Sequence, residues 1–422
     1  MRTIPLWQDQ APMEEQLGMD PLPQTTDVAI VGGGYTGLQS ARNLRDAGLD
    51  CAVLEEKEIG FGASSRNGGK ALVGLKHDAS TVARQFGNEI AEGLWRSSLE
   101  GINRIEEISL EEGIDCEYSR TGSVYLACRK KHFDSMQKES EWLDQHYNYK
   151  RVDVPKDELH SEIGTSVYHG GTVDPLSAGI HPAKWVKGLA KTAKLRSATL
   201  CSNTRVIQIT RLKNGFQIKT NRGNLISREV LVATNGYTEG LNKSISRRVV
   251  PVGSYIIATE PADPSLVKQL SPKARMFYDS NWFLKYFRFT TDGRMLFGGR
   301  TTISTGQDLK KSAALLQKDM CEMFPQLASL AVTHSWNGQL GVTFDALPHI
   351  GKVDGIHYAL GYGGHGVALS IVLADHVSEL IAGKRQHSLF SEISHPTYLF
   401  YRNKPWFGPF LGLGLRILDK IG

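Results

Sequence analysis

A short apolar run followed by a glycine turn is the feature that most constrains the fold of this chain. Residues 27–31 (DVAIV) have the composition of a β-strand, and residues 32–37 (GGGYTG) satisfy the pattern G-x-G-x-x-G. Residues 38–48 (LQSARNLRDAG) then favour a helix that ends at a glycine cap, and residues 51–55 (CAVLE) favour a second strand. The sequence therefore predicts a Rossmann-type βαβ unit near its beginning.

Each part of this unit has a physical reason in dinucleotide binding. Gly32 permits the tight turn, Gly34 lets the backbone reach a pyrophosphate, and Gly37 allows helix and strand to pack closely. The helix N-terminus offers N–H groups and partial positive charge to phosphates, and Glu55 can accept hydrogen bonds from ribose hydroxyls. The predicted dinucleotide site comprises Gly32, Gly34, Tyr35, Thr36, Gly37, Glu55 and Glu56.

Two further glycine-rich segments extend this site. Residues 62–69 (GASSRNGG) carry small and hydroxyl side chains that let backbone lie against a flat ring system, although the segment also suits a surface loop. Residues 361–367 (GYGGHGV) open a late helix, whose N-terminal dipole suits an electron-rich group unless it is a plain helix start. Predicted cofactor contacts from these and neighbouring segments are Gly62, Ala63, Ser64, Ser65, Arg66, Asn67, Gly68, Gly69, Val206, Thr234, Asn235, Gly363, Gly364, His365, Gly366 and Val367.

The order of segments indicates two interwoven domains. Residues 88–112 have helical spacing of apolar positions, whereas the regions 200–234 and 247–300 are rich in strand-forming runs. Nucleotide-type motifs lie near both ends, with β-rich material between them and no flexible linker. We expect an α/β fold in which residues 1–85, 155–240 and 331–422 form a discontinuous nucleotide-binding domain, and residues 86–154 and 241–330 form a substrate domain.

Composition excludes several other classes of protein. Five scattered cysteines without a CxxC pair argue against a disulfide framework and a zinc site, so we expect no metal and a cytoplasmic location. The net charge of +5 without a dense basic tract argues against nucleic acid as a partner. The first residues lack an export signal, and no run is long enough to cross a membrane. An apolar stretch at 405–418 favours packing or subunit association over a membrane surface, and the oligomeric state stays open.

These motifs, taken together, resemble a known family. The glycine motif, GASSRNGG, the strand end Val232-Ala233-Thr234-Asn235, the run at 286–300 (YFRFTTDGRMLFGGR) and ALGYGGHGV resemble the D-amino-acid-oxidase-like FAD oxidoreductases, which include glycine and sarcosine oxidases. The closest pattern is that of the γ-glutamylputrescine oxidase branch. Two positions depart from this branch: Ser65 replaces a usual glycine, and Lys285 replaces a common acidic residue. The resemblance implies a Rossmann-type FAD-binding domain with an inserted β-rich substrate domain.

The resemblance also implies the chemistry. A neutral amine would lie over the flavin, hydride would pass from the carbon beside nitrogen to the ring, and the imine would hydrolyse. Reoxidation by O2 would give H2O2. Relatives with covalent FAD use a cysteine near the late segment or a histidine in the early loop. Residues 336–351 have no cysteine and residues 62–69 have no histidine, so noncovalent FAD is expected.

Substrate contacts are expected from the aromatic strand and its neighbours. Arg288 aligns with the arginine that binds a substrate carboxylate in amino-acid-oxidising relatives, and a charged hydrogen bond of this kind is worth ~1.5–3 kcal/mol. A structural arginine or core packing is the competing interpretation at each position. The candidates are Arg288, Tyr286, Trp282, Tyr255, Lys285, His365 and Arg300.

Three other functions stay open at this point. An FAD dehydrogenase that passes electrons to a quinone or carrier protein is suggested by the apolar stretch near the end of the chain. A tRNA-directed flavoprotein is compatible with the mild basic balance but lacks a basic tract, and a non-enzymatic FAD scaffold is the third. The motifs do not fix the amine, for which a γ-glutamylated polyamine, another N-substituted amino acid or a secondary amine would serve.

Overall fold

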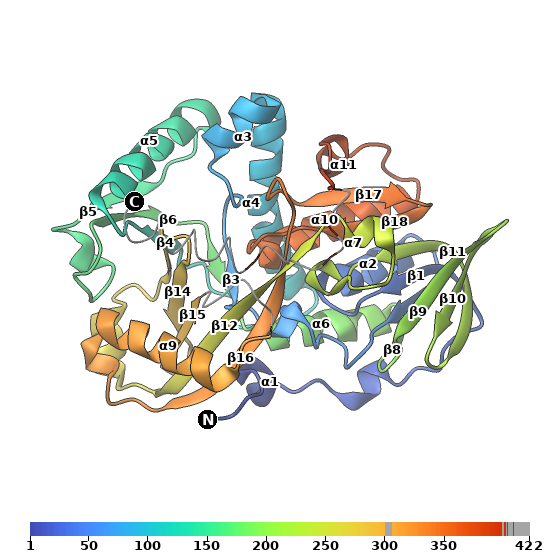
Figure 1. Cartoon of the computed structure of the whole chain (residues 1–422), viewed down its shortest axis with the longest axis horizontal. Helices are drawn as coiled ribbons and strands as arrows, with labels where there is room; N and C mark the ends of the chain where they lie inside the picture. Colours follow the sequence, from blue (N-terminus) through green and yellow to red (C-terminus); the bar gives the residue numbers. More distant parts are fainter. Residues whose placement is uncertain (300–305, 399–400, 402, 404–407, 409–422) are drawn as a thin grey trace.

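The computed structural model describes residues 1–299, 306–398, 401, 403 and 408. Arg300 and most of the apolar stretch at 405–418 lie outside these residues. The described part of the chain forms two sheets that lie side by side, the first on the right of Figure 1 and the second on the left.

The first sheet is built around the strand that precedes the glycine motif. Its order is β17-β18-β11-β1-β2-β8, and β1 pairs in parallel with both β2 and β11. The pairs β2–β8 and β11–β18 are also parallel, while β17 closes one edge antiparallel to β18. The strands are β1 (Thr25–Val31), β2 (Cys51–Leu54), β8 (Thr199–Cys201), β11 (Gly223–Val232), β17 (His349–Val353) and β18 (Ile356–Leu360).

Both faces of β1 are buried, as expected for a central parallel strand. Val28 and Ile30 pack against one core with the helices, whereas Ala29 and Val31 pack against a second core with the antiparallel strands β9 and β10. The helices pack on each other through the pairs α2–α10, α2–α6 and α4–α10. The elements are α2 (Tyr35–Asp46), α4 (Asn88–Glu111), α6 (Pro182–Leu195), α10 (Gly366–Ile381), β9 (Val206–Leu212) and β10 (Gly215–Thr220).

The second sheet is mostly antiparallel and has the order β16-β12-β15-β14-β13-β4-β6-β5. One face carries Phe277, Phe287 and Phe297, whose rings stack across neighbouring strands and pack with Phe324 and helix α9 (Leu309–Met323). The strands are β4 (Ser123–Leu126), β5 (Val152–Pro155), β6 (Gly170–Asp174), β12 (Val250–Pro261), β13 (Met276–Asp279), β14 (Lys285–Phe289), β15 (Arg294–Gly299) and β16 (Val332–Val342). Together the two sheets confirm the predicted α/β fold with a β-rich second domain.

Sheet membership divides the chain differently from the predicted domain boundaries. Strand β16 pairs with β12 along most of its length, and β6 also belongs to the second sheet, although 155–240 and 331–422 were assigned to the nucleotide-binding domain. Helix α4, assigned to the substrate domain, packs on α10 and shares the core of the first sheet. Strands that pair although they are far apart in the sequence leave no local pattern from which the domain boundaries could be predicted. We propose that β4–β6 and β12–β16 define the second domain.

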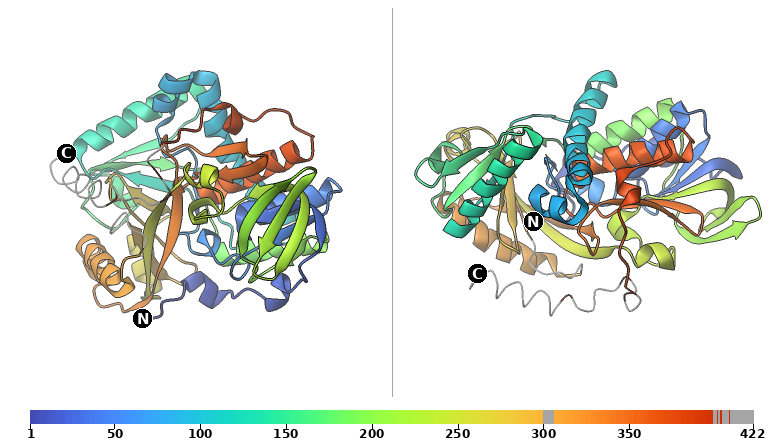
Figure 2. Two further views of the ribbon diagram at one scale, coloured as in Figure 1. Left: turned by 45° about the vertical axis from the view of Figure 1, so that its right-hand side comes forward. Right: turned by 90° about the horizontal axis from the view of Figure 1, so that it is seen from above.

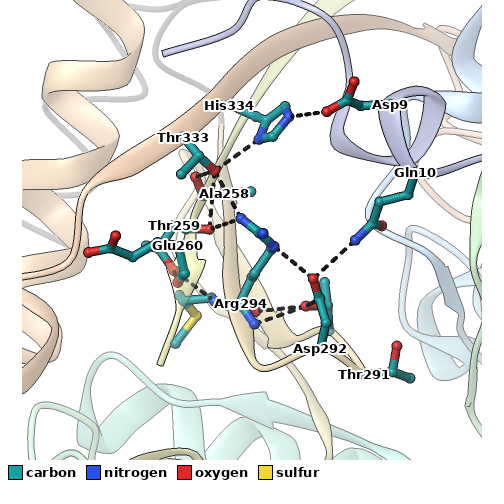
Figure 3. Close-up of polar contacts among 12 residues, drawn as sticks. Asp9, Gln10, Ala258, Thr259, Glu260, Thr291, Asp292, Arg294, Thr333 and His334 are labelled. Atoms are coloured by element: carbon teal, nitrogen blue, oxygen red, sulfur yellow. Dashed lines mark hydrogen bonds and ion pairs between the residues drawn. The ribbon is translucent and has the colours of Figure 1, made fainter. Parts of the chain in front are cut away.

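The first residues of the chain fasten the second sheet to the first domain. Helix α1 (Leu6–Gln10) buries Leu6 and Trp7 in a cluster with Ala183 of α6 and with residues of β12, β15 and β16. Figure 3 shows its polar contacts, in which Asp9 bonds to Nε2 of His334 at 3.2 Å and Gln10 donates to Asp292 at 3.1 Å. The further views in Figure 2 show these N-terminal residues beside the second sheet.

Among the described residues, none of the helices combines the length and hydrophobicity needed to span a bilayer. The same residues contain no group of three or more His, Cys, Asp or Glu side chains arranged to hold a metal ion.

Candidate functional site

A cavity of about 730 Å³ opens where β1 ends and α2 begins, and we call it the nucleotide cleft. Helix N-termini at the carboxyl edge of a parallel sheet are where such folds bind dinucleotides. The predicted residues that line the cleft are Gly32, Gly34, Tyr35, Thr36, Glu55, Glu56, Gly62, Ala63, Ser64, Asn67, Val206, Thr234, Asn235, Gly363, Gly364, Gly366 and Val367.

The glycines of the first turn leave no space for side chains. Gly32 has a φ of +109°, which L side chains rarely adopt. A Cβ atom on Gly37 would lie 1.9 Å from the carbonyl oxygen of Gly32, and one on Gly34 would lie 2.6 Å from Oγ of Ser64. The turn is therefore a backbone cradle, with Gly37 behind it as the contact between helix and strand.

Glu55 follows β2 and borders the nucleotide cleft. Its carboxylate accepts hydrogen bonds from the backbone N–H of Gly33 at 2.8 Å and of Lys57 at 3.0 Å. Burial raises the pKa of Glu55, and these two bonds oppose that rise. Each carboxylate oxygen retains a further lone pair as an acceptor. Glu55 thus fixes the glycine turn as well as offering an acceptor to a ribose.

The early and late glycine segments meet in space, as the cofactor hypothesis requires. Oγ1 of Thr36 and the hydroxyl of Tyr362 form a hydrogen bond of 2.7 Å between the first turn of α2 and the loop before α10. The backbone N–H of Gly361 donates to Oδ1 of Asn235 at 3.0 Å, which adds the end of β11 to the same junction. Segments more than 300 residues apart in sequence therefore form one wall of the cleft.

Two buried tryptophans hold the loop at 62–69. The indole N–H of Trp7 donates to the carbonyl of Asn67 at 2.8 Å, and that of Trp336 donates to the carbonyl of Arg66 at 2.9 Å. Both indoles belong to the cluster beneath α1. The loop is consequently anchored from the N-terminal helix and from β16 at adjacent peptide groups.

Not every predicted cofactor residue reaches the nucleotide cleft. Ser65 is 2% exposed, and its hydroxyl donates to the carbonyl of Gly60 and accepts from Gln8. The serine that replaces the usual glycine here therefore has a structural role. Gly37 and Gly69 lie behind the lining. Arg66, Gly68 and His365 border a second cavity instead.

This second cavity, of about 260 Å³, lies between the loop at 62–69 and one face of the second sheet, and we call it the inner cavity. It shares lining residues from both glycine segments and from β16 with the nucleotide cleft, so the two cavities join. The shared residues are Ala63, Asn67, Gln339, Leu340, Gly363, Gly364 and Val367.

The floor of the inner cavity is a row of residues in register across the second sheet. Tyr286 of β14 pairs with Tyr278 of β13, Tyr278 with Tyr125 of β4, and Tyr125 with Thr172 of β6. The Tyr286 ring extends over Gly298 of the next strand. This row, which we call the tyrosine row, runs from the junction with the nucleotide cleft to the far end of the inner cavity.

Two nitrogen-bearing side chains border the inner cavity near the junction. His365 precedes α10, and its Nδ1 atom is buried without a hydrogen-bond partner. Burial and the charge of Lys76 lower the pKa of His365 to about 4, so the ring is neutral at neutral pH. Lys70 is 7% exposed, and its Nζ donates to the carbonyl of Phe277 at 2.5 Å. Burial and the nearby Arg288 lower the pKa of Lys70 well below its usual value.

These residues fit FAD. The glycine cradle offers backbone to a pyrophosphate, Glu55 offers an acceptor to a ribose, and the joined cavities bring the loop at 62–69 beside the start of α10. The unpartnered Nδ1 of His365 and the N-terminus of α10 suit the electron-rich edge of a flat ring.

The predicted substrate residues lie in different parts of the structure. Tyr286 lines the inner cavity, and its hydroxyl bonds to Ser254. Tyr255 lies in the core on the opposite face of the sheet, Lys285 forms an ion pair with Asp319 of α9, and Trp282 is 58% exposed. None of these three lines either cavity. Alternation along β12 and β14 directs Tyr255 and Lys285 to the face opposite the inner cavity, and Trp282 lies in the segment between β13 and β14. The structure thereby corrects their expected placement.

Arg288 also turns away from both cavities. Its Nη1 donates to the carbonyls of Gly69 at 2.7 Å and of Ile180 at 3.3 Å, and the side chain is 9% exposed. Burial lowers the pKa of Arg288 to about 10. This geometry favours the structural interpretation, in which Arg288 supports the end of the loop at 62–69.

The variant Arg288→Met separates the two roles. We expect a lower melting temperature and lower FAD content, because charged hydrogen bonds of ~1.5–3 kcal/mol are lost. KM should change by the same factor for amines with and without a carboxylate. Arg294→Met, which removes an ion pair with Asp292 outside the site, is the control. A rise in KM confined to carboxylate-bearing amines would show instead that Arg288 anchors the substrate.

Asp279 is a buried carboxylate on the border of the inner cavity. It is 3% exposed and accepts from the backbone N–H groups of Asn281 and Lys285. Burial raises its pKa from 3.8 to about 6. Because the pKa in the folded state exceeds that in the unfolded state, ionisation destabilises the fold above pH 6, and this cost disappears below about pH 4.

Asp279→Asn should therefore stabilise the protein at high pH. A pKa shift of this size corresponds to an increase in the free energy of unfolding of up to about 3 kcal/mol at pH 8 and to no increase near pH 4. Melting temperatures of both proteins between pH 4 and pH 8 would test this. An advantage that is the same at every pH would refute ionisation as its cause.

Several lining residues were not identified from the sequence, among them Lys70, Tyr125, Ser254, Tyr278 and Asp279. Lys70 directly follows GASSRNGG, and its place next to that motif could have identified it from the sequence. The tyrosines and Ser254 come from strands whose register and facing only the folded sheet defines.

Comparisons with known proteins agree with this geometry. Residues 27–380 match the family model described as DAO, FAD dependent oxidoreductase. The γ-glutamylputrescine oxidoreductase of Escherichia coli K12 is 30% identical over 404 residues, covering 94% of both chains. A probable oxidoreductase OrdL of Haemophilus influenzae is 33% identical, covering 88% of this chain and 86% of its own.

A solved structure shows the same fold. Glycine oxidase from Geobacillus kaustophilus superposes with a TM-score of 0.77 at 21% identity, covering 89% of this chain and all of that protein. With the matched family model extending over most of the sequence, the chain belongs to the DAO family of FAD-dependent oxidoreductases.

Proposed function

We propose that this enzyme oxidises the carbon–nitrogen bond of an amine, with a γ-glutamylputrescine-like compound or another N-substituted amino compound as substrate. The observation that carries this proposal is the junction of the two cavities, which brings a second binding space to the residues that fit the flavin end of FAD. The similarity to γ-glutamylputrescine oxidoreductase along almost the whole chain supports an amine over other substrates.

When bound, FAD supplies the hydride acceptor, and its reoxidation by O2 would release H2O2. The residues of the chain position the cofactor and the substrate and stabilise the charge that develops between them. The N-terminus of α10 and the neutral His365 stabilise negative charge near the junction. The loop at 62–69, fixed by Trp7 and Trp336, forms the boundary between the cofactor and the substrate.

Lys70 has a separate role in this proposal. An amine loses hydride from its α-carbon only when the nitrogen is neutral, because its lone pair must be available. Lys70 borders the inner cavity, and its own pKa is lowered by burial and by Arg288. The burial and the positive charge of Arg288 that lower the pKa of Lys70 also disfavour an ammonium ion from the substrate at the same place, so a substrate amine beside Lys70 is favoured in its neutral form.

The test is an anaerobic titration of the purified protein with a small panel of amines. We expect a yellow protein whose flavin absorbance is bleached by a γ-glutamyl diamine and much less by glycine, sarcosine or a simple polyamine. Admission of O2 should restore the colour and yield one H2O2 per amine oxidised. If no amine bleaches the flavin, the proposed activity is wrong.

The same preparation distinguishes the electron acceptor and the mode of attachment. Turnover that is equal with and without O2, given an artificial acceptor, would favour a dehydrogenase that serves a quinone or carrier protein. Residues 62–69 contain no histidine and residues 336–351 no cysteine, so acid precipitation should release the flavin into the supernatant.

We also propose a cytoplasmic location and small molecules, not nucleic acid, as partners. Each of the five cysteines, all within the described ranges, is a free thiol, which supports a reducing compartment.

A further inference from the structure

The inner cavity is long in one direction. The tyrosine row crosses three strand-to-strand steps from Tyr286 to Thr172, and neighbouring strands lie ~4.8 Å apart, so it extends for about 14 Å. Midway along the row, the rings of Tyr125 and Tyr278 stack on each other with their centroids 4.8 Å apart. The lining also includes Leu72, Leu75 and other apolar groups. This middle section suits a chain of methylene groups.

At the far end, an arginine lacks the partners that such a group normally has. Arg151 lines the cavity, and its Nε is buried with no hydrogen-bond partner. Within the described residues its Nη2 donates to the carbonyl of Met136 at 3.4 Å, and no ion pair to Arg151 forms. A guanidinium left in this state favours an anionic ligand.

An acidic residue at the same end is also incompletely satisfied. Glu139 of α5 (Lys130–Tyr147) is 7% exposed, and among the described residues its carboxylate accepts hydrogen bonds from Ser80 alone, with the backbone N–H of Ser80 at 3.3 Å. By contrast, the nearby Asp174 accepts from the hydroxyl of Tyr149 and from two backbone N–H groups. Within the described ranges Glu139 and Arg151 do not form an ion pair with each other, although both border the cavity.

We infer that Arg151 and Glu139 bind the carboxylate and the ammonium of an α-amino-acid head group, at the end of an elongated amine whose other end is oxidised near Tyr286. The inference rests on the proposed function. A simple diamine would place a cation against Arg151, and a dicarboxylate would place an anion against Glu139. Only a zwitterion satisfies both groups, and glycine or sarcosine is too short to extend along the tyrosine row.

The test separates binding of the head group from oxidation of the amine. The probe is L-γ-glutamyl-n-butylamide, which has the head group and the chain but lacks the amine at the end that is oxidised, and N-acetylbutylamine is the matched compound without the head group. Binding to the FAD-loaded protein is measured by calorimetry. We expect the wild type to bind the glutamyl compound at least tenfold more tightly than the acetyl compound.

Arg151→Gln and Glu139→Gln should each weaken binding of the glutamyl compound by about tenfold or more, with no change for the acetyl compound. Lys150→Gln and Glu141→Gln remove the same charges from exposed neighbouring positions and should have no effect. Equal binding of the two compounds by the wild type, or unchanged binding by both cavity variants, would overturn the inference. Tight binding of the glutamyl compound without flavin bleaching by γ-glutamyl diamines would refute the amine oxidation and leave the head-group site standing.

Discussion

Gly37→Val is expected to yield a protein that purifies without FAD. The new Cβ would lie 1.9 Å from the carbonyl oxygen of Gly32 and 3.3 Å from Ile30, so the backbone must move. Overpacking of this kind costs about 3 kcal/mol, and the displaced Gly32 is itself part of the phosphate cradle. FAD affinity should therefore fall by about 100-fold or more. Flavin absorbance per protein and titration of the apoprotein with FAD would measure this.

Gly306→Ala is the control, because a Cβ at that position meets nothing within 4 Å. Circular dichroism of both apoproteins separates loss of FAD from general unfolding. If Gly37→Val retained full flavin content and normal affinity, close packing of α2 on β1 would not be what forms the cofactor site.

The first half of the cofactor site could be predicted from the sequence because its signals are local. A strand, three spaced glycines, a helix and Glu55 occupy fewer than 30 consecutive residues, and each follows from backbone geometry at that place. The late segment at 361–367 was identified for the same reason. The contact between Thr36 and Tyr362 shows that these separate local signals describe one site.

The substrate side was predicted less well, since it depends on which face of a strand each side chain occupies. Tyr286 and Lys285 are adjacent in sequence, yet one lines the inner cavity and the other pairs with Asp319. Arg288 lies on the same strand, but its guanidinium binds backbone carbonyls of two loops. An aromatic strand with an arginine predicts neither its register nor the loops that pack against it.

The second large effect is expected at the two tryptophans that hold the loop at 62–69. Trp7 and Trp336 are 1% and 0% exposed, and truncation of either to alanine should cost about 3–5 kcal/mol of folding stability. The phenylalanine variants keep most of the packing but lose the bond to the carbonyl of Asn67 or Arg66, and that bond is worth about 1 kcal/mol in each case. FAD affinity should fall in both phenylalanine variants, because this loop lines the nucleotide cleft.

The matched control is Trp185→Phe. Trp185 is equally buried, but its indole nitrogen has no hydrogen-bond partner, so the substitution removes packing alone and should leave FAD affinity unchanged.

The two loop anchors act on adjacent peptide groups, and once one is lost the loop is already displaced. The double variant Trp7→Phe/Trp336→Phe should therefore weaken FAD binding by a factor different from the product of the single effects. Strict additivity, or an equal loss in Trp185→Phe, would mean that the indole N–H groups do not position the loop. In that case the junction of the two cavities would depend on the packing of the cluster beneath α1.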